Sequence, residues 1–183
     1  MNFDALNRFL SKENIRRHEE YLNTSRLKMS ILCKSDDRLQ GKTPLQINKM
    51  KIDSEIKKDY CRLYWCIRSH EAFFNSFRLD AGINPKDRPR AEKLLYDIYT
   101  LGMKAEYGFI YIHRDRSEVR ISISSNKNFL DFQKNPLCID MYEHSYLLDY
   151  GFKKDRYLKN ALYYLDVGRV LDNSHQKGYN YIK

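Results

Sequence analysis

Residues 140–150 read Asp-Met-Tyr-Glu-His-Ser-Tyr-Leu-Leu-Asp-Tyr, and they join an expected short strand at 136–140 to a helical segment. Because Asp140 and His144 stand four residues apart across this junction, their side chains can be aimed at one point. A carboxylate and an imidazole so placed are common ligands of manganese, iron or zinc. The pair alone is weak support, since Asp and His often fall this close by chance. A metal site would need further ligands from elsewhere in the chain.

Two long amphipathic helices are expected before this stretch. The first begins after Ser11, a residue type that suits a helix N-cap, and its apolar stripe contains Ile15, His18, Leu22, Ser25, Met29 and Leu32. The stripe of the second helix contains Ile56, Tyr60, Leu63, Ile67, His70, Phe74 and Phe77. Both stripes advance by three or four residues, which is the period of a helix face. The intervening segment, 35–51, holds Gly41 and Pro44 and is expected to be a loop, so the helices should form an antiparallel hairpin.

His18 and His70 each occupy a core position of these stripes. One histidine on an apolar face is more often a hydrogen-bonded core residue than a ligand. Two on facing stripes need a common partner, since burying a polar group without one costs roughly 2–7 kcal/mol. With Asp140 and His144 they make three imidazoles and one carboxylate, a set without thiolates. Such a set suits iron or manganese at least as well as zinc.

The rest of the chain predicts a second lobe with a small sheet. A helix is expected at 90–104, and the β-rich run at 109–112 and the alternating residues 119–123 predict two strands. With the strand at 136–140 they would form a three-stranded antiparallel sheet, followed by helical segments from Glu143 onward.

The predicted fold class is therefore α+β, an N-terminal antiparallel helical hairpin followed by a C-terminal α/β lobe. The irregular stretch 81–85, with Pro85, is the expected boundary. We predict an N-terminal helical hairpin domain at 1–80 and a C-terminal α+β domain at 88–183, with the metal site between them.

The amino-acid composition limits the classes of protein to which this sequence can belong. Lys and Arg number 33 against 24 Asp and Glu, which gives a net charge of +9 and favours anionic partners without choosing among them. The sequence lacks an apolar run of the roughly 20 residues that span a membrane. We expect neither a signal nor a transit peptide, and therefore a cytoplasmic protein with its four cysteines reduced.

Three stretches, in order along the chain, resemble the iron/manganese superoxide dismutase family. Residues 11–18 resemble that family's opening helix, which ends in the first metal histidine, and 69–75 resemble the block that carries the second. Residues 140–146 are similar to the family signature Asp-x-Trp-Glu-His-Ala-Tyr.

The resemblance implies one iron or manganese ion per chain, bound by His18, His70, Asp140 and His144. It implies dismutation of superoxide, a small anion, to oxygen and hydrogen peroxide. It also implies a homodimer in which Glu143 reaches the His144 ring of the other copy.

Several residues around the expected site depart from the family pattern. The gateway tyrosine, eight residues after the first histidine, is replaced by Arg26, and a nearby histidine by Leu22. The glutamine of iron-type members corresponds to Cys66, and that of manganese-type members falls near Lys127. Other family aromatics are replaced by Phe74, by the 108–109 region, by Tyr142 and by Leu147.

These departures predict a slower or differently tuned enzyme. Arg26 is expected either to attract superoxide near the entrance or to be a solvated helix residue. The alternative function is a non-catalytic structural protein, associated with RNA or a ribonucleoprotein, that has kept the fold and a structural metal or a differently tuned redox site. Salt-dependent RNA binding without dismutation would favour that alternative.

Overall fold

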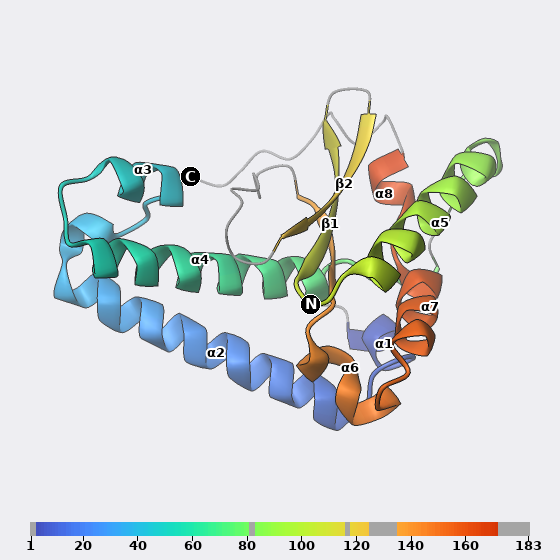
Figure 1. Cartoon of the computed structure of the whole chain (residues 1–183), viewed down its shortest axis with the longest axis horizontal. Coiled ribbons are helices and arrows are strands. Elements are labelled where there is room, and N and C mark those ends of the chain that lie inside the picture. Colours follow the sequence, from blue (N-terminus) through green and yellow to red (C-terminus); the bar gives the residue numbers. More distant parts are fainter. Residues whose placement is uncertain (1–2, 81–82, 116–117, 125–134, 172–183) are drawn as a thin grey trace.

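The structure is a computed structural model and describes residues 3–80, 83–115, 118–124 and 135–171. Helices predominate, and one small antiparallel sheet lies at the end of a long helical hairpin (Figure 1). The predicted α+β class is confirmed. Within the described residues no helix combines the length and the apolar character needed to cross a membrane.

Helices α2 (Lys12–Ser35) and α4 (Ser54–Phe74) form the hairpin and run side by side in opposite directions (Figure 1). Ser11 caps α2 by accepting a hydrogen bond from the backbone N–H of Asn14, as its residue type predicts. Asp53 caps α4 in the same way. The facing stripes are buried between the helices, which places His18 and His70 in the interior.

The prediction of a loop at 35–51 is wrong, because this segment contains two short helices. These are η1 (Asp37–Leu39) and α3 (Pro44–Lys49). Thr43 and Gln46 form a capping box in which each side chain bonds the other's backbone N–H, and this box starts α3. Helix α3 packs on α4, and a small core there consists of Cys33, Leu39, Ile47 and Tyr60. A helix of six residues is too short to give a recognisable helical period in the sequence.

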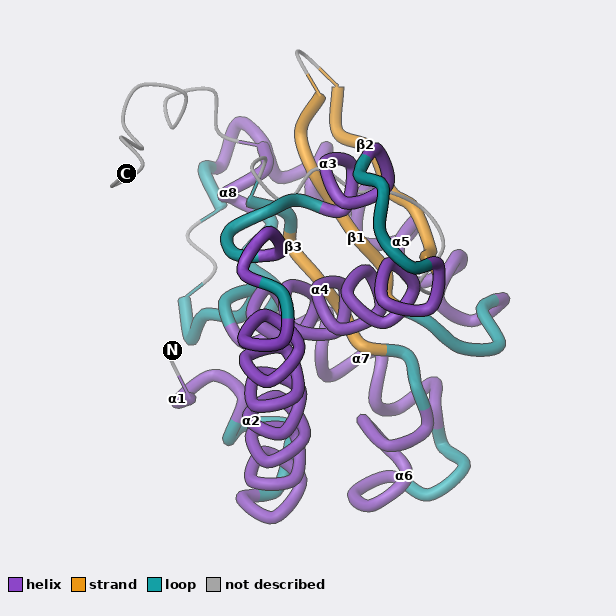
Figure 2. Tube along the Cα trace, turned by 90° about the vertical axis from the view of Figure 1, so that its left-hand side faces the viewer, coloured by secondary structure: helices purple, strands orange, loops and turns teal. Residues whose placement is uncertain are grey.

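The sheet has the order β2-β1-β3, with all neighbours antiparallel. Its strands are β1 (Phe109–Asp115), β2 (Glu118–Ser124) and β3 (Leu137–Asp140), and Figure 2 shows β1 between the other two. Phe109 pairs with Ser124 on one side and with Asp140 on the other. This register fixes Asp140 at the end of β3, beside α4, against which the strand packs.

The remaining helices complete the core around the sheet. They are α1 (Phe3–Leu6), η2 (Pro85–Asp87), α5 (Arg88–Lys104), α6 (Glu143–Tyr150), α7 (Lys154–Tyr164) and α8 (Gly168–Leu171). Helices α5 and α7 approach closely at Gly102, where an added Cβ would lie 2.6 Å from a methyl group of Leu158. Helix α6 begins three residues after β3 ends and packs against α2. It therefore brings His144 back toward the hairpin.

Candidate metal centre

Four side chains from four separate elements converge on one point. His18 comes from α2, His70 from α4, Asp140 from the end of β3 and His144 from α6. The Nε2 atoms of the three histidines lie 3.7, 3.8 and 3.2 Å, in that order, from Oδ2 of Asp140. The donor atoms of His18, Asp140 and His144 all lie within 4.8 Å of one another. One small cation could bridge these three side chains, while His70, with Nε2 3.8 Å from Oδ2 of Asp140, falls outside this compact group.

Backbone carbonyls orient two of the imidazoles. Nδ1 of His18 lies 2.9 Å from the carbonyl oxygen of Asn14, and Nδ1 of His70 lies 2.7 Å from that of Cys66. Because a carbonyl oxygen only accepts, each Nδ1 carries the hydrogen, and each Nε2 has the lone pair that can bind a metal; that of His18 also lies 3.3 Å from Oγ of Ser145. Histidine ligands are commonly oriented in this manner.

The polar atoms at the centre are buried and fit a cation. Oδ1 of Asp140 accepts a hydrogen bond of 2.9 Å from the backbone N–H of Tyr142. Among the described residues, Oδ2 of Asp140 and Nε2 of His70 are buried without a regular hydrogen-bond partner. Buried polar groups are normally satisfied, and a metal ion held by these residues would satisfy both. Three imidazoles and a carboxylate suit iron or manganese.

The ionisation of these groups also suits a metal. Burial raises the pKa of Asp140, but the neighbouring imidazoles of His144 and His18 outweigh it and hold this pKa well below its ordinary value. Burial lowers the pKa of His70, which favours its neutral form. Burial also lowers the pKa of His144, but the Asp140 carboxylate, whose Oδ2 lies 3.2 Å from Nε2, reverses the shift and raises it. Metal binding requires an ionised carboxylate and neutral imidazoles, so a proton on His144 would compete with a metal ion.

A cavity of about 760 Å³ opens over the three histidines. Its other lining residues are Arg17, Tyr21, Cys66, Phe109, Tyr142, Leu147 and Leu148. The His144 side chain is 49% exposed, whereas those of His18 and His70 are almost fully buried. A substrate or a solvent molecule would therefore reach the histidines through this cavity.

Tyr21 is a residue of this cavity that the sequence interpretation missed. Its ring centroid lies 5.3 Å from that of His70 and 6.0 Å from that of His144. Burial, with a smaller effect from Cys66 and its hydrogen bond, raises the pKa of Tyr21, so the phenol keeps its proton at neutral pH. The available signal was its spacing, because residues three apart lie on one helix face and Tyr21 is three residues after His18.

Cys66 also lies at the cavity, where the family pattern has a glutamine. Its Sγ is 3.2 Å from Oγ of Ser25 and 3.8 Å from Nδ1 of His70. Burial raises the pKa of the Cys66 thiol, which is therefore neutral and a weak donor.

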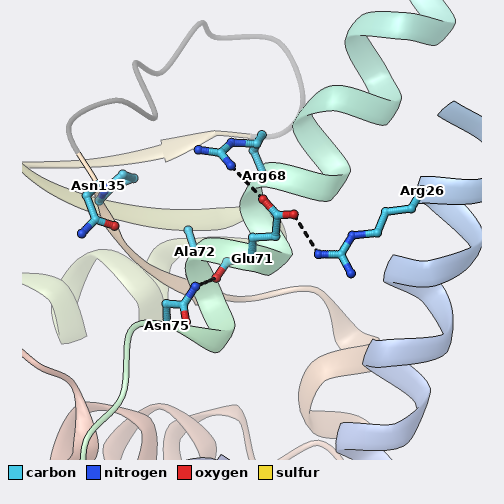
Figure 3. Close-up of a pocket in the computed structure, with 7 residues that line it drawn as sticks. Arg26, Arg68, Glu71, Ala72, Asn75 and Asn135 are labelled. Atoms are coloured by element: carbon cyan, nitrogen blue, oxygen red, sulfur yellow. Dashed lines mark hydrogen bonds and ion pairs between the residues drawn. The ribbon is translucent and has the colours of Figure 1, made fainter. Parts of the chain in front are cut away.

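The expectation that Arg26 lies near the entrance to the site is not met. Its guanidinium lies 2.8 Å from the carboxylate of Glu71, which also pairs with Arg68 (Figure 3). These residues line a separate cavity of about 250 Å³, together with Asn75 and Asn135. Arg26 does not line the cavity over the histidines.

The other residues that the sequence analysis compared with the family pattern lie at varied places in the fold. Glu143 is exposed at the first position of α6. Leu22 and Phe74 are buried in the core, and Leu147 is 41% exposed on α6. Lys127, near which the second glutamine was sought, lies outside the described residues.

An α+β fold that gathers three imidazoles around one carboxylate would suit a single metal ion. Residues 97–173 match the family model of iron/manganese superoxide dismutases, C-terminal domain. This match, over less than half of the chain, supports membership of the iron/manganese superoxide dismutase family. The matched range contains Asp140 and His144, while His18 and His70 precede it. A search of curated proteins gives no match.

Proposed function

We propose that the protein is a superoxide dismutase that converts superoxide to oxygen and hydrogen peroxide. An iron or manganese ion, when bound, would supply the one-electron redox chemistry. His18, His70, Asp140 and His144 would hold it, with His18 and His70 from a hairpin domain and the other two from the C-terminal domain. The convergence of three imidazole nitrogens on one buried carboxylate oxygen, within 3.8 Å, is the observation that supports this most.

The chain's own residues would orient and tune the site. The carbonyl oxygens of Asn14 and Cys66 fix two imidazole rings, and the Asp140 carboxylate supplies the negative charge. Tyr21 presents a protonated phenol at the cavity. Because the thiol of Cys66 is a weaker hydrogen-bond donor than a glutamine amide, we expect turnover slower than the family pattern would give.

Metal analysis combined with a superoxide assay tests the proposal. Protein expressed with both metals available should contain iron or manganese in equal number to protein chains and should consume superoxide. Zinc alone, or a metal-loaded protein without activity, would contradict it. The family match lends no support to the alternative of an RNA-associated structural protein. Salt-dependent RNA binding by a protein without dismutase activity would favour that alternative.

Guidance of the anionic substrate is expected from Arg17 and Arg62 in place of Arg26. Arg17 lines the cavity, and the charge of Arg62 acts on Tyr21 and Cys66. Replacing either arginine by alanine should lower kcat/KM roughly two- to tenfold at low ionic strength, and the difference should shrink as salt screens the charge.

Arg26→Ala is the matched control, because Arg26 is also an exposed, ion-paired arginine of α2. Its partner Glu71 lies outside the cavity, whereas Arg17 pairs with Glu13 and lines it. Steady-state rates measured across a salt series separate the variants. A larger effect from Arg26→Ala than from Arg17→Ala would contradict this assignment.

A homodimer built around α6 is the second expected feature. Glu143 and His144 are exposed next to Leu147 and Leu148, which are 41% and 46% exposed. If Glu143 bonds the partner's imidazole, Glu143→Ala should raise the dimer dissociation constant at least about tenfold, since truncating one member of a buried pair strands the other. Sedimentation velocity measures this constant. Glu55→Ala, at the far end of α4, is the control, and an equal effect of the two would argue against the bridge.

A further inference from the structure

Tyr21 and Cys66 contact the same imidazole from two different helices. The ring centroid of Tyr21, on α2, lies 5.3 Å from that of His70, and Sγ of Cys66, on α4, lies 3.8 Å from Nδ1 of His70. Both residues also line the cavity over the histidines. A phenol and a thiol therefore lie beside one expected metal ligand, where small molecules that enter the cavity can reach them.

Ser25 shows that the Cys66 sulfur lies close to Tyr21. Ser25 is four residues after Tyr21 and is therefore on the same face of α2, one turn further along. Its Oγ lies 3.2 Å from Sγ of Cys66. The sulfur thus contacts both the next turn of the face that carries Tyr21 and the imidazole that Tyr21 contacts. Tyr21 and Cys66 also shift each other's pKa, as close neighbours do.

A thiol and a phenol in this position share one oxidation chemistry. Cys66 is a free cysteine, so its sulfur is available to an oxidant. Thiols and phenols each lose one electron and one proton in a one-electron oxidation. The two oxidised groups can then combine through the sulfur and the ring carbon next to the hydroxyl.

We propose that a thioether cross-link joins Cys66 to Tyr21 when the metal-loaded protein meets hydrogen peroxide. The new bond links Sγ of Cys66 to the Tyr21 ring carbon next to the hydroxyl. The S–H bond and one ring C–H bond break, and the two protons and two electrons released reduce one hydrogen peroxide to two water molecules. A bound metal ion would supply the one-electron steps. The inference therefore rests on the proposed function, whose product is hydrogen peroxide.

The cross-link would tie α2 to α4 beside the cavity. It would hold the Tyr21 phenol against the rings of His70 and His144, and it would remove Cys66 from other oxidation. A covalent tie between residues distant in sequence also restrains the unfolded chain. Cross-linked protein should therefore unfold at a higher denaturant concentration than protein of equal metal content without the cross-link.

Peptide mass spectrometry tests the cross-link, because trypsin places the two residues in separate short peptides. Cleavage at the flanking arginines releases residues 18–26 with Tyr21 and residues 63–68 with Cys66. After hydrogen peroxide treatment of iron- or manganese-loaded protein, the two peptides should be recovered joined, with a mass two hydrogen atoms below their sum. Tyr21→Phe, Cys66→Ser and the metal-free protein should give the two peptides separately.

Cys33 and Tyr60 provide a matched control pair within the same chain. They pack in the small core shared by α2, α3 and α4, which contains none of the expected ligands. Trypsin releases them in residues 29–34 and 59–62. These peptides should stay separate in the treated protein. Joining of this pair in equal yield would overturn the proposal, because peroxide would then oxidise such pairs without help from the metal site.

The outcomes separate this proposal from the proposed function. Metal-loaded protein whose two peptides stay separate, or whose Cys66 carries added oxygen atoms instead, would overturn the cross-link and leave the metal site standing. Cross-linking in loaded protein that does not consume superoxide would overturn the dismutase function alone, because the peroxide is supplied in the test. Failure of the unmodified protein to bind iron or manganese would overturn both.

Discussion

Asp140→Asn is expected to abolish stable binding of iron or manganese. The change preserves size and leaves an oxygen to accept from the backbone N–H of Tyr142, but it removes the only charge among the four expected ligands. Replacing groups that merely orient metal ligands costs about 10- to 100-fold in metal affinity, so loss of the carboxylate itself should cost at least as much. Elemental mass spectrometry of the purified variant measures the metal content, and superoxide consumption should fall with it.

Asp166→Asn is the matched control for this change. Asp166 is also a buried carboxylate, 5% exposed, but it faces Arg78 away from the histidines. That variant should keep its metal even if it is less stable. Normal metal content in Asp140→Asn, or equal loss in both variants, would show that the four side chains are not the binding site.

The arrangement of the four expected ligands could be predicted from the sequence because each element has a strong local signal. Ser11 marks the start of α2, and the three-four stripes identify the buried faces of α2 and α4 that carry His18 and His70. The alternation in β2 predicts a half-buried strand, and its pairing with β1 follows. These signals depend on the local spacing of apolar residues, so the helices and strands remain recognisable when neighbouring residues differ.

The positions of the side chains around the four expected ligands could not be predicted from the sequence, because they depend on contacts between separate helices and strands. Arg26 stands eight residues after His18, about 12 Å further along α2, and a nearby acid on α4 decides where its guanidinium goes. Tyr21 is one turn from His18, and only the meeting of α2 with α4 and α6 places its ring beside two other histidines. The contact between Ser145 and His18 likewise joins residues 127 positions apart.

Phe73→Ala is expected to cause the largest loss of stability among the substitutions considered. Phe73 is fully buried on α4, and its ring lies nearly parallel to that of His18, with centroids 5.5 Å apart. Truncating such a side chain costs about 3–5 kcal/mol of unfolding free energy, from lost burial and from the cavity left behind. Denaturant unfolding of the metal-free protein measures this cost. Phe152→Ala, at a side chain 93% exposed, should cost less than about 0.5 kcal/mol.

Because the Phe73 ring packs against the His18 imidazole, metal affinity should also fall in Phe73→Ala. A variant that loses stability but keeps full metal affinity would mean that Asn14 and Ser145 alone hold the imidazole in place.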